Sequence, residues 1–403
     1  MAGAKRIADK NIYVIYAAVL LLGVAYGTSI AVLAIHLDAH GIPKIAMGGL
    51  AAAFATGIVV LSIPAGWLVQ RVGAKKTMLG ALVGYSVCVG CFPFLGTVTQ
   101  LSIARFFDGA FSVGIWVAAE TALLKRSDKA NKAFVMSLYA ISLAVGYVLG
   151  PLAATGLVRV SGTSATFVAA GVLAIIAAIV VATRLDGDRG AKKDEEDAGP
   201  SSASAFSVFW RTKTSCLATF SYGYFQASVV LFLPLYLVES KNVPKDKTIL
   251  ITAFFAAGML ALATWVSRLG DRHGHLLVMR TLGAVGGMMV ASFVLLDSFA
   301  FMCAAVFVAG ATLASISPVS LALQGVITPH SDLGRANAFY NAAYAAGMLI
   351  GPPISSVIFT RFGGAAMLFH LAALWAGFVV FTVVFASDDP RARSRRAEPA
   401  MLR

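Results

Sequence analysis

The sequence has few charged residues, which make up only 13% of its 403 residues. Soluble domains contain about 25% charged residues, so this chain lacks the polar surface that a water-soluble protein of its size needs. Cysteine is also scarce. The four cysteines, Cys88, Cys91, Cys216 and Cys303, all lie in apolar segments, which does not suggest a disulfide framework.

Motifs for enzyme chemistry are missing as well. The sequence has no Walker phosphate-binding loop, no His, Cys and carboxylate cluster with metal-ligand spacing, and no pattern of a nucleophile beside a base. We therefore expect no enzymatic activity, no cofactor, no metal site and no process driven by ATP bound to this chain.

Apolar residues dominate what is present: 59% of the chain is hydrophobic, the mean hydropathy is +0.82, and there are 38 glycines. A membrane-spanning helix takes about 20 mostly apolar residues. Twelve apolar segments of this length are predicted, near residues 12–37, 45–69, 76–97, 99–124, 133–158, 165–183, 212–238, 248–267, 280–297, 299–325, 335–360 and 364–386. The first segment is too long for the apolar part of a cleavable signal peptide, and we expect it to be a spanning helix.

The basic residues predict an orientation. The net charge of +13 would suit a nucleic-acid partner, but most of the 32 Lys and Arg residues fall in alternate loops between the apolar segments. Because cytoplasmic loops carry the excess of Lys and Arg, this pattern predicts that both termini are cytoplasmic. The basic excess is then a signal of topology, and no nucleic-acid partner is expected.

A charged stretch rich in Gly, Pro and Ser divides the apolar segments into two sets of six. We expect a six-helix bundle over residues 1–184, a cytoplasmic linker over 185–211, a second bundle over 212–387 and a cytoplasmic tail over 388–403.

The two sets resemble each other at a fixed spacing of 201 residues. The matching patterns are Gly66-x-x-x-Gln70-Arg71-x-Gly73 with Ser267-x-x-x-Asp271-Arg272-x-Gly274, and Gly146-x-x-x-Gly150-Pro151 with Gly347-x-x-x-Gly351-Pro352. Duplicated halves place a substrate site near the middle of the bilayer, which is typical of a transporter.

At these motifs the chain resembles the major facilitator superfamily over nearly its whole length. The stretch from Gly66 to Lys76 is similar to the family's loop signature, with Gln70 where the family usually has an aspartate. Arg105-Phe-Phe-Asp108-Gly109 resembles the fourth-helix motif, whose arginine is implicated in proton coupling. The stretch from Gly146 to Pro151 resembles a fifth-helix motif of the antiporter branch, without the Gly-Gly that often closes it.

The resemblance implies an all-α integral membrane protein with twelve transmembrane helices in two pseudo-symmetric six-helix bundles. It further implies a bacterial drug or metabolite–proton antiporter of the inner membrane. Such a protein works by alternating access as a monomer in the lipid bilayer, and its partners are protons and a small-molecule substrate.

Arg105 is the most informative single residue. An arginine inside an apolar helix costs about 2.5–3.5 kcal/mol on insertion scales and normally faces a cavity or a partner. Asp108 lies within helical pairing distance, and Glu120 lies farther along the same helix. Two interpretations stay open: the pair neutralises itself and only holds packing, or these residues form a proton or anion site. Glu120 also has pairing with Lys125 as an alternative role.

Polar and aromatic residues on the helices expected to line a cavity are candidate substrate contacts. Hydrogen bonding between helices is the alternative role for each of them. The candidates are Tyr26, Ser29, Ser112, Trp116, Tyr222, Phe225, Gln226, Ser315, Asn341 and Tyr344.

A third group is expected to act in conformational change, through close helix approach, kinks at proline and ionic contacts at helix ends. Its members are Gly66, Gln70, Arg71, Gly73, Gly146, Gly150, Pro151, Asp271, Arg272, Gly351 and Pro352.

The sequence as a whole favours a secondary active transporter with proton-coupled efflux. Uptake or exchange of an organic anion, transport of a lysolipid, and a non-transporting sensor are the alternatives.

Overall fold

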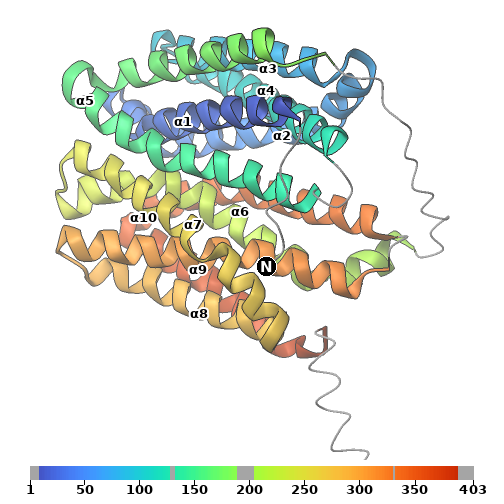
Figure 1. Ribbon diagram of the computed structural model, residues 1–403. Helices are drawn as coiled ribbons and strands as arrows, with labels where there is room; N and C mark the ends of the chain where they lie inside the picture. Colours follow the sequence, from blue (N-terminus) through green and yellow to red (C-terminus); the bar gives the residue numbers. More distant parts are fainter. Residues whose placement is uncertain (1–8, 128–131, 188–203, 330–331, 389–403) are drawn as a thin grey trace, which may run out of the picture. The chain divides into compact units, whose positions relative to one another are not determined.

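The computed structural model describes residues 9–127, 132–187, 204–329 and 332–388, and these residues are almost entirely helical (Figure 1). A helix satisfies its backbone hydrogen bonds internally, as hydrocarbon surroundings require. The helices are α1 (Lys10–Ala39), α2 (Lys44–Val72), α3 (Ala74–Cys91), α4 (Val98–Arg126), α5 (Lys132–Arg184), α6 (Ala205–Lys241), α7 (Lys245–His273), α8 (His275–Ser292), α9 (Phe299–Ile327) and α10 (Leu333–Val384). Short 3₁₀ turns lie at Phe92–Phe94 (η1), Phe293–Leu295 (η2) and Ala386–Asp388 (η4).

The predicted apolar segments all overlap these helices. Among the described residues, nine helices are long and apolar enough to cross a membrane. Two of them, α5 with 53 residues and α10 with 52, are too long to cross once, since at 1.5 Å per residue each would extend about 80 Å. Each contains two predicted segments, so twelve spans stay a prediction. The helix α6 begins at Ala205, inside the range predicted as linker.

Glycines with positive φ interrupt the helices at matching places. Gly162 in α5 has φ 78° and ψ 178°, and Gly363 in α10 has φ 86° and ψ 168°. Gly73 joins α2 to α3 with φ 97°, and Gly274 joins α7 to α8 with φ 103°. This backbone region is essentially open to glycine alone. Both pairs are 201 residues apart, so the repeat seen in the sequence extends to backbone geometry.

The chain divides into two compact units. Unit 1 comprises Met1–Asp194 and Pro244–Ala253, and unit 2 comprises Glu195–Val243 and Phe254–Arg403. In unit 1, α1 packs along α5, α2 along α4, and α3 against both α4 and α5. In unit 2, α6 packs along α10, and α8 packs against α9 and α10. The predicted domain limits differ from these units in detail and stay a prediction.

Glycine permits a close helix contact between α1 and α5 in unit 1. A Cβ atom added at Gly146 of α5 would lie 2.6 Å from the Cα of Gly23 on α1, and one added at Gly150 would lie 2.6 Å from the Cα of Gly27. Inside a bilayer, where helix association gains little from the hydrophobic effect, such small residues let backbones approach and gain dispersion contacts. The motif at Gly146 is therefore explained by the packing of α5 on α1.

The equivalent glycines make the equivalent contact in unit 2. A Cβ atom at Gly347 of α10 would lie 2.2 Å from the carbonyl oxygen of Phe220 on α6, and one at Gly351 would lie 2.6 Å from that of Tyr224. Helices α6 and α10 thus repeat the contact of α1 and α5.

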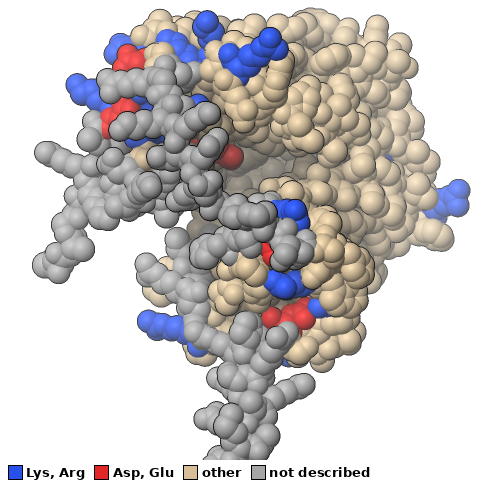
Figure 2. All heavy atoms as spheres, turned by 90° about the vertical axis from the view of Figure 1, so that its right-hand side faces the viewer, with Lys and Arg blue, Asp and Glu red and all other residues tan. Residues whose placement is uncertain are grey.

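Charged side chains lie mainly at helix ends. Arg71 is in the last turn of α2, and Lys125 and Arg126 are in the last turn of α4. Lys and Arg side chains are visible among the helix ends that Figure 2 shows. The orientation in the membrane stays a prediction.

Candidate functional site

The centre of the candidate site is an ion pair inside α4 of unit 1. The helix begins with a capping box in which Thr97 and Gln100 satisfy each other's backbone. About two turns on, Arg105 pairs with Asp108, and their side chains are only 11% and 7% exposed. The Arg105 guanidinium also lies 4.3 Å from the ring centroid of Phe54 on α2. Two opposite charges are thus held together among apolar groups.

Ser112 completes the polar centre from the next turn of α4. Its hydroxyl donates to the carbonyl oxygen of Asp108 at 2.6 Å and lies 3.4 Å from the carboxylate Oδ1. The carboxylate of Asp108 therefore has both Arg105 and Ser112 as partners.

Aromatic rings from three other helices surround this centre. The ring of Tyr26 on α1 lies 4.9 Å from that of Tyr85 on α3 and 6.1 Å from that of Trp116 on α4. Tyr147 on α5 stacks on Tyr26 with ring centroids 6.1 Å apart. The side chains of Tyr26 and Tyr85 are buried. The charge of Asp108 acts on both tyrosine hydroxyls, which places them near the ion pair.

Four donor groups of this cluster have no hydrogen-bond partner among the described residues. They are Nε of Arg105, the hydroxyls of Tyr26 and Tyr85, and Nε1 of Trp116. A buried polar group left unsatisfied costs about 1–3 kcal/mol. A water molecule, an ion or a ligand is the usual partner of such a group.

The other predicted residues of unit 1 have local partners. Ser29 donates to the carbonyl oxygens of Ala25 and Tyr26 within α1, at 3.1 and 3.2 Å. Glu120 is half-buried and interacts with Tyr139 on α5 rather than with Lys125. Tyr26 lies near Asp108 and contacts Trp116, Ser112 bonds to Asp108, and Glu120 has a separate partner.

In unit 2 the predicted residues form two groups. Tyr344 on α10 donates to Oε1 of Gln226 on α6 at 2.9 Å and stacks on Tyr222 with ring centroids 6.1 Å apart. Phe225 packs against Phe255 and Trp375 in the aromatic core of the unit.

Two further residues of unit 2 were predicted to contact the substrate. Ser315 donates to the carbonyl oxygen of Ala311 at 2.6 Å, a bond within α9, and Asn341 on α10 is exposed.

Several residues predicted to act in conformational change lie near the ends of α2 and α7, the helices that carry the matching motifs. Gly66 has open space around it, Gln70 is exposed, and the Arg71 guanidinium lies 4.9 Å from the ring centroid of Trp67. Arg272 is exposed in the last turn of α7. The side chain of Asp271 lies outside the described residues.

Sequence reasoning missed part of the aromatic cluster. Tyr85 and Tyr147 lie on the third and fifth apolar segments and carry no motif of their own. In unit 2 it also missed the contact between Tyr224 and Nε2 of His370, at 2.8 Å. Spacing along one helix identifies residues on that helix only, so contacts from other helices were beyond its reach.

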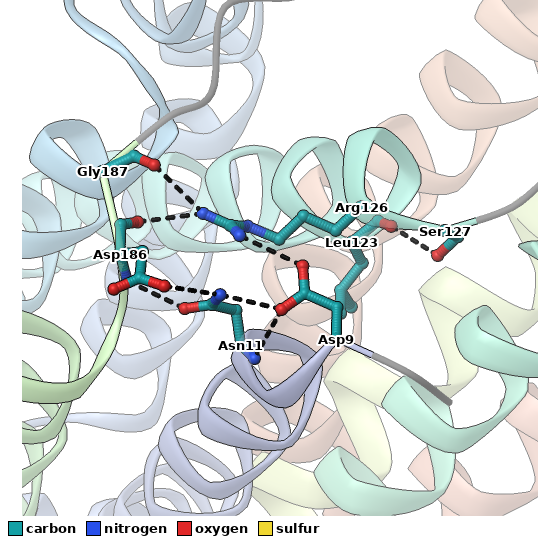
Figure 3. Close-up of polar contacts among 7 residues, drawn as sticks. All are labelled: Asp9, Asn11, Leu123, Arg126, Ser127, Asp186 and Gly187. Atoms are coloured by element: carbon teal, nitrogen blue, oxygen red, sulfur yellow. Dashed lines mark hydrogen bonds and ion pairs between the residues drawn. The ribbon is translucent and has the colours of Figure 1, made fainter. Parts of the chain in front are cut away.

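A polar network at the end of unit 1 was also missed (Figure 3). Arg126 at the end of α4 bonds to Oδ2 of Asp9 at 3.2 Å and to the carbonyl oxygens of Asp186 and Gly187 at 2.9 and 3.2 Å. Asn11 bonds to both Asp9 and Asp186, at 2.8 and 3.1 Å. The network joins the start of α1 to the ends of α4 and α5.

Known proteins with a similar sequence are transporters. The chain is 24% identical over 377 residues to the uncharacterized MFS-type transporter YcaD of Salmonella arizonae. The aligned region covers 92% of this chain and 94% of that protein. No enzyme is indicated, since these relatives are transporters.

Solved structures show the same fold. A bacterial homologue of the human lysosomal transporter Spinster has a TM-score of 0.73 at 14% identity, over 96% of this chain and 97% of that one. The nucleoside transporter NupG has a TM-score of 0.77 at 12% identity, over 94% and 98%. Identities this low indicate the fold and not the substrate.

A family model spans nearly the whole sequence. It matches residues 15–244 and again residues 215–401, in agreement with the internal repeat. Together with the apolar helices, this match shows that the chain is a multi-pass membrane transporter that belongs to the Major Facilitator Superfamily.

Proposed function

We propose that this transporter couples the movement of a small organic molecule to protons, and that the Arg105–Asp108 pair carries the coupling. The observation that supports the proposal is the burial of both charges inside α4. Ionisable residues within membrane helices are costly and mark proton relays or ion pathways. One proton on Asp108 neutralises its carboxylate and releases Arg105, so protonation changes what the guanidinium can bind.

Efflux by proton antiport is the first form of this proposal, because the sequence from Gly146 to Pro151 resembles an antiporter motif. Close packing on α1 accounts for that motif, however, and unit 2 has the same packing at Gly347. The motif therefore gives no preference between efflux and uptake.

Co-transport of an organic anion with a proton is the second form. Its support is the excess of unpaired donors around Arg105, because donors without acceptors suit a ligand rich in acceptor atoms. In this form the proton occupies Asp108 while the anion occupies Arg105. A lysolipid, whose phosphate is also an anion, is a third form.

Purified protein in liposomes that enclose a pH-sensitive dye would test the proposal. The membrane voltage is clamped, and organic cations, carboxylates, sugars and lysolipids are added outside in turn. Antiport makes the interior alkaline as a substrate enters, whereas co-transport makes it acidic. We expect Asp108→Asn and Arg105→Ala to slow the pH change about tenfold or more, since a hydrogen bond to a charged group is worth about 1.5–3 kcal/mol.

Protein-free liposomes correct for passive entry of weak acids. Arg184→Ala, at an exposed arginine that ends α5, is the matched control and should transport at the wild-type rate. If no compound changes the interior pH more than in protein-free liposomes, proton coupling is wrong. If Arg105→Ala moves protons as fast as the wild type, the pair does not carry the coupling.

A further inference from the structure

The cluster around Arg105 also indicates the chemical class of the substrate. We propose that it binds an aromatic carboxylate, with the carboxylate on Arg105 and the hydroxyls of Tyr26 and Tyr85, and with the aromatic ring against Trp116. This proposal rests on the co-transport form of the proposed function.

The charge of the ligand follows from the balance of donors and acceptors. Arg105, Tyr26, Tyr85 and Trp116 present four groups that can donate and have no partner among the described residues. The carboxylate of Asp108 is engaged by Arg105 and Ser112. A ligand carboxylate brings two oxygens with about four acceptor sites and matches the planar guanidinium in a bidentate arrangement. A cationic ligand would instead meet Arg105 and leave the donors unsatisfied.

The aromatic part of the ligand follows from the groups around the donors. The rings of Tyr85, Trp116 and Tyr147 all lie within 6.1 Å of the ring of Tyr26, measured between centroids. Aromatic rings favour other aromatic rings in offset-stacked or edge-to-face contact, beyond the gain from burial alone. Trp116 and Tyr147 are only partly buried.

Binding of the anion should take up one proton. An ionised Asp108 holds Arg105, and an anion that displaced it would leave a buried carboxylate without its partner, which is strongly unfavourable. A protonated Asp108 removes that obstacle. Arg105 and Ser112 on α4 bond to the Asp108 carboxylate. Its charge also interacts with Tyr26 on α1 and with Tyr85 and Cys88 on α3. Beyond these groups, Tyr147 on α5 stacks on Tyr26, and Phe54 on α2 lies over the Arg105 guanidinium.

Calorimetric titration of the purified protein with benzoate would test the proposal. Cyclohexanecarboxylate has the same charge without the aromatic ring, and benzamide has the ring without the charge. We expect benzoate to bind about tenfold more tightly than either. Because one proton is taken up, the dissociation constant for benzoate should rise about tenfold for each pH unit at which Asp108 of the free protein is ionised.

Single substitutions assign the contacts. Tyr26→Phe and Tyr85→Phe remove one donor each and should weaken benzoate binding about tenfold. Tyr16→Phe is the matched control, because the hydroxyl of Tyr16 already donates to the carbonyl oxygen of Val135 in the same unit, at 2.9 Å. It should leave the dissociation constant unchanged. Asp108→Asn should bind benzoate at pH 7 at least as tightly as the wild type, with no dependence on pH.

The outcomes separate this inference from the proposed function. If the wild type binds benzoate no better than benzamide, the anion proposal is wrong, whatever the variants do. If cyclohexanecarboxylate binds equally well, the aromatic part is wrong. If benzoate binds as expected but moves no protons in liposomes, the binding site stands and proton coupling fails. If other compounds move protons while benzoate does not bind, coupling stands and this inference fails.

Discussion

At the scale of a single residue, Asp9 contributes to the stability of the polar network at the end of unit 1. Burial raises the pKa of its carboxyl group, but the hydrogen bonds from Asn11 and Arg126 lower it by more, so the pKa lies below its ordinary value. The folded protein therefore favours the ionised form. Its contribution to stability is complete above pH 4 or so, the ordinary pKa of an aspartate, and is lost as the pH falls through the lowered pKa.

We expect Asp9→Asn to lower the free energy of unfolding by about 1 kcal/mol at neutral pH, since Asp9 is partly exposed and its ion pair with Arg126 is partly screened. The thermal midpoint in detergent measures the effect. The difference in thermal midpoint between wild type and variant should be constant between pH 8 and 5. It should shrink below about pH 4, because the wild-type carboxyl group is then protonated and neither protein carries the charge. Asp38→Asn, at the other end of α1, is the control. A gap that persists in acid would contradict this account.

At the scale of elements, the close packing of α5 on α1 predicts how substitutions at its glycines change stability. Gly146→Leu would place a side chain where a Cβ atom already lies 2.6 Å from Gly23. Neither backbone can shift without moving its helix, so we expect the free energy of unfolding to fall by about 1–3 kcal/mol. Gly347→Leu in unit 2 should behave alike, because its Cβ atom would lie 2.2 Å from the Phe220 carbonyl oxygen.

Size-exclusion chromatography after heating would measure the fraction of intact protein for each of these variants. Gly156→Leu is the matched control on α5, since nothing lies within 4 Å of a Cβ atom there. A Gly146 variant as stable as the Gly156 variant would show that the close contact is not needed.

At the scale of the whole molecule, the orientation in the membrane can be tested by labelling residues on either side of α2. Ala39 ends α1 and Lys76 lies in the first turn of α3, so they flank α2 on opposite sides, and both are exposed. The charge pattern predicts that Ala39 is outside and Lys76 inside. With the four native cysteines replaced, we expect a membrane-impermeant maleimide to label Ala39→Cys in intact cells and Lys76→Cys only after lysis. The reverse labelling pattern would overturn the predicted orientation.

Much of the architecture could be predicted because membrane helices have a strong signal in the sequence. A span needs about 20 apolar residues, and satisfying the backbone in hydrocarbon leaves a helix as the structure for such a run. The family motifs and the Arg105–Asp108 pair followed from residues close together in the chain, and the repeat followed from matching such motifs between the two halves. The breaks at Gly162 and Gly363 fall between predicted apolar segments, although glycine is too frequent in this sequence to mark the exact residue of each break.

By itself, then, the sequence determined which segments are helices, the family, and the helix that carries the buried charges, because apolar length and local spacing encode these features. The tertiary structure decided which helices meet. It brought Tyr85 of α3 and Tyr147 of α5 to Tyr26 of α1 and thereby to Arg105. Contacts between distant segments depend on how small residues let helices approach, and no spacing within one helix encodes them.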